Sequence, residues 1–292
     1  MSNTPSESQD MAALLRAVLE PVLAPVSAGR HLGEISAALE VARVGAWMSH
    51  LRPSWLQALD RACATYQSKL RSATRSQAIA LVLEPGRLPR PLRSAAVETQ
   101  SLAREEASRL ERTFQQWRES EEGVACRVAL RKALKQGGKS KPLYLPNTQI
   151  DECLRRAEAS MHKAEKKLRQ QVRWKSIREH GRAAQRLRQT QQIVCLLGHE
   201  LVSDKLNEAI AKYRVVAQTR RAARWLREMI ETSPLDVESS SAAGALWFQV
   251  YRRQQQVSRE LLLDCALDTS AAATPVARKP SRPALPLAMK FG

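Results

Sequence analysis

Proline marks where helices in this 292-residue chain can run and where they must stop. Two long spans contain no proline, residues 92–141 and residues 147–233. Proline breaks a helix interior because it has no amide hydrogen and its ring clashes with the preceding turn, so spans without it accommodate long helices. The sequence therefore predicts helices in both spans. Breaks are expected at Pro53, between residues 85 and 91, around residues 137–146, and at Pro234.

Apolar side chains recur at intervals of three or four residues within the helical spans, as on one face of a helix. One such face comprises Leu56, Leu59, Cys63, Tyr66 and Leu70. Aromatic residues are only 4% of the chain and glycines number 11, which disfavours β-folds. No segment alternates like a strand, and we interpret residues 78–83 as the end of a helix. The sequence predicts an all-α fold.

The two ends of the chain differ from its middle in composition. Residues 1–10 are mostly polar, and residues 269–292 are rich in proline and basic side chains. Such composition is typical of segments that cannot bury a core, so we predict disorder at both ends. A helical domain is expected over residues 11–268. Its last helix should run from about 242 to 265, after a loop at 236–241.

The strongest charge pattern lies between Arg155 and Arg188, which we predict to be a helix. This stretch contains twelve lysines and arginines and three glutamates, so it supplies half of the chain's net charge of +18. An apolar stripe from Leu154 to Val172 gives the helix a face that can dock on a core. A docked helix with one-sided charge indicates an anion-facing element. The alternative is a solvated basic surface without a ligand.

Several classes of protein are disfavoured by the sequence. The five cysteines are odd in number, widely spaced and never in a CxxC pair, which argues against a zinc site or a disulfide framework. No apolar run is long enough to span a membrane, and no signal peptide is recognisable. The segment Gln136–Lys141 lacks the spacing of a phosphate-binding loop, and no catalytic constellation is found. We predict a cytoplasmic protein that is not an enzyme and has no cofactor or metal.

One segment of the basic stretch resembles the opening motif of a known family. Residues 178–188 (REHGRAAQRLR) are similar to the motif His-x-x-Arg-(Val/Ile)-x-x-(Arg/Lys)-(Arg/Lys)-x-Arg of the CHAD family, the conserved histidine α-helical domain. If Arg188 takes the last position, Arg178 stands at the family's histidine and His180 is displaced by two residues. Residues 211–226 resemble a later helix of the family, with Arg220 and Arg221 where Asn and Asp usually stand.

The first half of the chain carries a weaker form of the same resemblance. Residues 40–44 (EVARV) resemble His-x-x-Arg-Val, with Glu40 in the histidine position and Arg43 in the arginine position. The basic cluster that usually follows has shrunk to His50 and Arg52. Residues 73–83, which include Arg75, resemble another first-half segment. A glutamate at a ligand-facing position would repel phosphate, or it could pair with Arg43 as a structural contact.

The resemblance implies two related helical bundles, at about residues 30–140 and 147–268, around a basic groove. It also implies binding of inorganic polyphosphate or a similar polyanion without catalysis. The site residues that follow from it are Arg43, Arg52, Arg75, Arg178, His180, Arg182, Arg186, Arg188, Arg220 and Arg221, with His180 as a phosphate donor or pH-sensitive contact.

The spacing of the arginines suits a linear polyanion. Arg178, Arg182 and Arg186 are four residues apart, so they share one helical face with Cβ atoms about 5–6 Å from one another. Such a row can follow a phosphate chain, and its affinity should fall steeply with salt. One alternative is a nucleic-acid-binding helical protein, in which Trp174 could stack on a base. Another is a CHAD-like scaffold that has lost ligand binding and contacts proteins.

Overall fold

The computed structural model describes residues 10–24, 32–49, 53–83, 90–198, 204–232 and 237–267. Within them every regular element is a helix, so the predicted all-α fold is confirmed. The segments predicted to be disordered, 1–10 apart from Asp10 and 269–292, lie outside the described residues. The helices are α1 (Met11–Val18), α2 (Glu20–Leu23), α3 (Leu32–Met48), α4 (Ser54–Val82), α5 (Arg90–Glu119), α6 (Glu121–Lys139), α7 (Asn147–Gln170), α8 (Trp174–Leu196), α9 (Asp204–Thr232) and α10 (Val237–Leu267).

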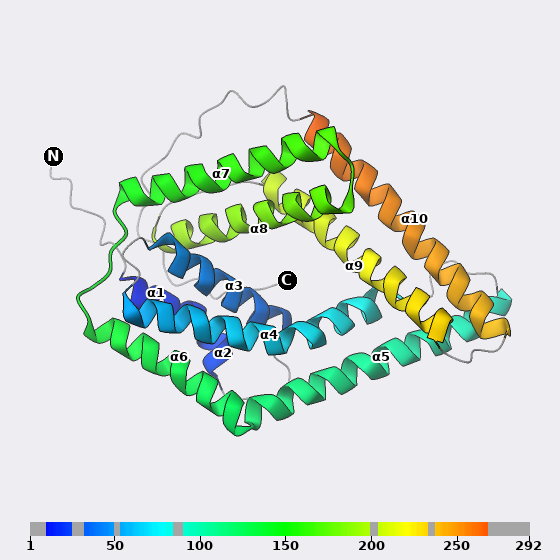
Figure 1. Ribbon diagram of the computed structural model, residues 1–292, viewed down its shortest axis with the longest axis horizontal. Helices are drawn as coiled ribbons and strands as arrows, with labels where there is room; N and C mark the ends of the chain where they lie inside the picture. Colours follow the sequence, from blue (N-terminus) through cyan, green and yellow to red (C-terminus); the bar gives the residue numbers. More distant parts are fainter. Residues whose placement is uncertain are drawn as a thin grey trace.

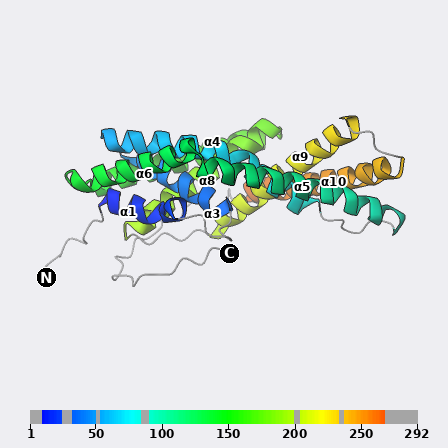
Figure 2. The same ribbon diagram turned by 90° about the horizontal axis from the view of Figure 1, so that it is seen from below.

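Helices from the two parts of the chain pack side by side. Helix α3 contacts α8, α4 contacts α9, and α5 contacts α10. Figure 1 shows α3, α4, α8 and α9 in the middle of the molecule, with α7 and α10 on two sides and α5 and α6 on another. Figure 2 shows that the body they form is elongated and flat. The division into two related bundles stays a prediction.

The largest apolar core joins the early helices. It contains the whole predicted face of α4, from Leu56 to Leu70, all of it buried. The Tyr66 ring packs edge-on against Phe114 at 5.8 Å and against Trp117 at 5.2 Å. These contacts hold α4 against α5 and fix which of its faces remains for α8 and α9.

The prediction of one helix between Arg155 and Arg188 is wrong, because the chain leaves the helix at residues 171–173. Helix α8 turns back along α7, so that Ala183 and Leu187 pack with Met161 of α7 in one cluster. Two helices folded together bury both apolar faces, which a single straight helix could not do. Val172 ends the predicted stripe but lies in the turn, 55% exposed.

Other boundaries of helices shift for similar reasons. Helix α4 ends at Val82, so residues 78–83 are the end of a helix as predicted. The loop expected at residues 236–241 is wrong, since α10 begins at Val237 and its Ser239 hydroxyl donates to Glu98 of α5 at 3.1 Å. Helix α6 continues through Gly137 to Lys139. A Cβ at Gly137 would lie 3.0 Å from Trp55, so the glycine lets α6 approach α4 closely.

Candidate functional site

An open pocket of about 820 Å³ lies between α4, α8 and α9, with α3 at its edge. We call it the arginine pocket, because eight arginines and two glutamates are among its lining residues, a formal balance of +6. The arginines are Arg71 and Arg75 from α4, Arg178 and Arg182 from α8, and Arg214, Arg220, Arg221 and Arg224 from α9; the glutamates are Glu40 and Glu228.

Most of these arginines have no acidic partner. Arg224 donates to Glu228 at 2.7 Å, one helical turn away. For the other seven, no carboxylate in the described part of the chain lies within salt-bridge distance. Partial burial, followed by the charges of Arg221 and Arg71, lowers the pKa of Arg75. The pocket therefore concentrates positive charge that its own residues do not neutralise.

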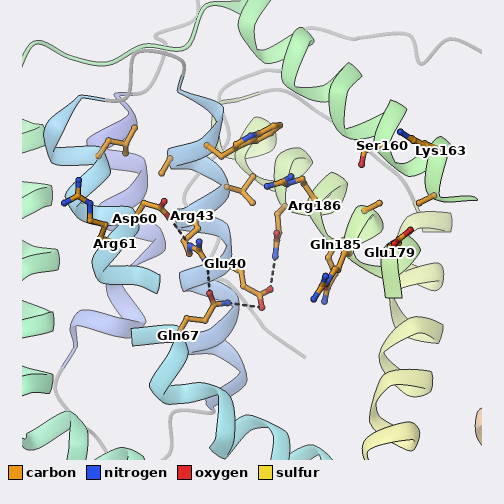
Figure 3. A pocket seen from close by; sticks show the side chains of 18 of the residues that line it. Glu40, Arg43, Asp60, Arg61, Gln67, Ser160, Lys163, Glu179, Gln185 and Arg186 are labelled. Atoms are coloured by element: carbon orange, nitrogen blue, oxygen red, sulfur yellow. Dashed lines mark hydrogen bonds and ion pairs between the residues drawn. The ribbon is translucent and has the colours of Figure 1, made fainter. Parts of the chain in front are cut away.

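A second pocket of about 1060 Å³ adjoins the first between α3, α4, α7 and α8. We call it the α3–α8 pocket; it shares Glu40, Gln67, Arg182 and Gln185 with the arginine pocket. Figure 3 shows its labelled side chains converging from these helices. Its cations are more fully occupied than those of the arginine pocket. Arg43 pairs with Asp60 at 2.9 Å, Lys167 pairs with Glu179 at 2.6 Å, and the Arg186 guanidinium lies 4.8 Å from the Trp47 ring centre.

Glu40 lies where the two pockets meet. Its carboxylate accepts hydrogen bonds from the amides of Gln189 at 2.8 Å and Gln67 at 3.4 Å. Arg43 donates to the Gln67 carbonyl oxygen at 2.9 Å, so it reaches Glu40 through Gln67 (Figure 3). Burial raises the pKa of the Glu40 carboxyl, and the nearby charge of Arg214 opposes that rise. The acid is thus held mainly by neutral amides.

The predicted site residues fall into three groups. Five line the arginine pocket: Arg75, Arg178, Arg182, Arg220 and Arg221. Arg43 and Arg186 line the α3–α8 pocket, which Arg182 also reaches. Arg188 lines neither pocket, although burial and then the charge of Arg214 lower its pKa. Arg52 lies outside the described residues.

His180 faces the protein interior. Its side chain is 1% exposed and it lines neither pocket. Each helical residue advances about 100° around the axis, so a position two residues from both Arg178 and Arg182 points away from them. Burial lowers the pKa of His180 to about 4, so the imidazole is neutral at physiological pH. We therefore leave His180 out of the candidate site.

Three arginines of the pocket were missed in the sequence: Arg71, Arg214 and Arg224. Arg71 precedes Arg75 by one helical turn, and Arg214 precedes Arg221 by two, so each shares a face with a residue that was selected. Helical spacing from the selected arginines would have found them.

Comparisons and searches for other kinds of site add no further assignment. No family model matches the sequence, and no curated protein matches it significantly. The CHAD resemblance therefore stays a prediction. Among the described residues, no group of His, Cys, Asp and Glu is arranged to hold a metal ion. No helix in the same residues is long and apolar enough to cross a membrane.

Proposed function

We propose that this chain binds inorganic polyphosphate or a similar phosphate polyanion in the arginine pocket, without catalysing a reaction. The observation that carries the proposal is the convergence of seven arginines without carboxylate partners from α4, α8 and α9. A guanidinium offers a planar fork of donors that matches phosphate oxygens. It also stays protonated and cannot act as a general base, which fits binding rather than catalysis.

The electrostatics of the pocket favour a ligand with many charges. Like charges this close repel one another, and a bound polyanion relieves that repulsion and releases counterions. The row Arg178, Arg182 and Arg186 on α8 extends from the arginine pocket into the α3–α8 pocket. A phosphate chain longer than one pocket can therefore continue into the next.

A competition titration tests this function. Fluorescent long-chain polyphosphate is bound to the protein at low salt and at about 0.15 M salt, and unlabelled polyphosphate, single-stranded DNA and duplex DNA are added as competitors. The proposal predicts that polyphosphate competes best and keeps its advantage at the higher salt. Equal competition by all three would indicate general charge attraction and favour the nucleic-acid alternative. Absence of binding would favour a scaffold that contacts proteins.

A further inference from the structure

A third open pocket, of about 550 Å³, lies between the start of α8, α9 and α10. Its lining includes Trp174, Trp247 and Tyr251, and we call it the aromatic pocket. The rings of Trp247 and Tyr251 are stacked, with their centres 5.3 Å apart and their planes 7° apart. Tyr251 is 40% exposed. A flat aromatic pair that remains open to solvent offers a surface for stacking.

The aromatic pocket is continuous with the arginine pocket. Both are lined by Trp174, Arg220, Arg224 and Glu228. The Arg220 guanidinium lies over the Trp174 ring, 4.7 Å from its centre, and so stands at the boundary. Helices α9 and α10, which carry most of the lining, run side by side in Figure 1.

The charges at this boundary leave one arginine available to an anion. Arg224 is paired with Glu228, and Arg227 is paired with Glu231, both at 2.7 Å. Arg220 has no carboxylate within salt-bridge distance among the described residues. A phosphate that entered the arginine pocket from the aromatic side would meet Arg220 first.

We propose that the aromatic pocket binds a nucleobase, and that the ligand of this end of the molecule is a nucleoside polyphosphate. The base stacks on the exposed Tyr251 and Trp247 pair, and the phosphates pass Arg220 into the arginine pocket. Nucleobases have π-faces that stack on aromatic side chains, and arginine supports such stacking. Gln254, which also lines the pocket, can donate to and accept from a base edge. This inference rests on the proposed binding of phosphate.

The test compares ATP with inorganic tripolyphosphate, which has the same number of phosphates and no base. Both are titrated calorimetrically into the full chain without divalent cations. Stacking predicts that ATP binds more tightly, by roughly 5- to 100-fold. Equal affinities would overturn the base pocket and leave phosphate binding intact. Binding of ATP without tripolyphosphate would keep the base pocket and overturn the proposed function, and binding of neither would overturn both.

Two matched variants on α10 locate the effect. Tyr251→Ala is expected to remove most of the preference for ATP while tripolyphosphate binds as before, and Tyr251→Phe should retain that preference. Phe248→Ala is the control, because Phe248 lies one turn earlier, is 54% exposed and lines none of the three pockets. An equal loss in Tyr251→Ala and Phe248→Ala would contradict the assignment.

Discussion

The Glu40 carboxylate accepts a 2.8 Å hydrogen bond from the side chain of Gln189, which joins α3 to α8 where the two basic pockets meet. Neutral amides therefore hold a negative charge at a place that a phosphate chain would have to pass. Because burial also raises the pKa of Glu40, this charge is poorly stabilised in the folded protein. Glu40 thus opposes the ligand that the surrounding arginines attract.

Glu40→Gln should therefore tighten polyphosphate binding. Removing one like charge near the ligand is worth about 1 kcal/mol, or about fivefold in affinity. Fluorescence titration measures the change, and Glu158→Gln is the control. Glu158 is an exposed residue of α7 that lines neither basic pocket. Equal gains in the two variants would show that only net charge matters.

Polyphosphate affinity should also rise as the pH falls. The pKa of Glu40 is raised above its ordinary value of 4.5, so protonation removes the repelling charge under mildly acidic conditions. We expect wild-type affinity to increase between about pH 7 and about pH 5, since a bound polyanion favours the protonated carboxyl. In Glu40→Gln the same titration should be flatter. Parallel pH profiles would refute a role for Glu40.

His180 should make the fold less stable in acid. Its pKa is about 4 in the folded protein and 6.5 ordinarily, so the unfolded chain binds the additional proton between these values. Stability therefore falls as the pH drops from about 6.5 to about 4, by roughly 3 kcal/mol in total. Urea unfolding at several pH values measures this loss. His180→Gln should show a smaller slope, and an unchanged slope would mean that other groups are responsible.

Gly181 is required where α8 crosses α9. A Cβ at this position would lie 2.1 Å from the Tyr213 ring, so Gly181→Ala must displace the ring and should destabilise the fold by roughly 1–3 kcal/mol. Gly244→Ala is the control, because a Cβ there meets no atom within 4 Å and the helix should gain up to about 1 kcal/mol. Urea unfolding distinguishes the two. A neutral Gly181→Ala would contradict the close packing.

Much of the helical fold could be predicted from local sequence. Proline positions located the start of α4 after Pro53, and apolar spacing identified its buried face from Leu56 to Leu70. The break at residues 171–173 was missed because no proline or glycine marks it. Packing of Leu187 with Met161, distant in sequence, accounts for that turn.

The candidate site was predicted only where one helix sufficed. Spacing placed Arg178 and Arg182 on one face, and both line the arginine pocket. Arg71 and Arg214 come from other helices, and their approach to α8 depends on tertiary packing that no local pattern encodes. His180 was selected from the family resemblance, although its helical position opposes that of Arg178.

The central claim is that polyanion binding depends on the arginine pocket rather than on net charge. Two charge-matched triple variants test it directly by titration with fluorescent polyphosphate at about 0.15 M salt. The first changes Arg75, Arg178 and Arg221 to glutamine, one from each helix of the pocket. The second changes three exposed cations of α7 that line neither basic pocket: Arg155, Lys166 and Arg169.

We predict that the pocket triple binds polyphosphate about 100-fold more weakly, since each lost phosphate contact is worth roughly 1 kcal/mol, while the α7 triple loses only a few-fold. Equal weakening in the two triples, with helicity unchanged in both, would contradict the account.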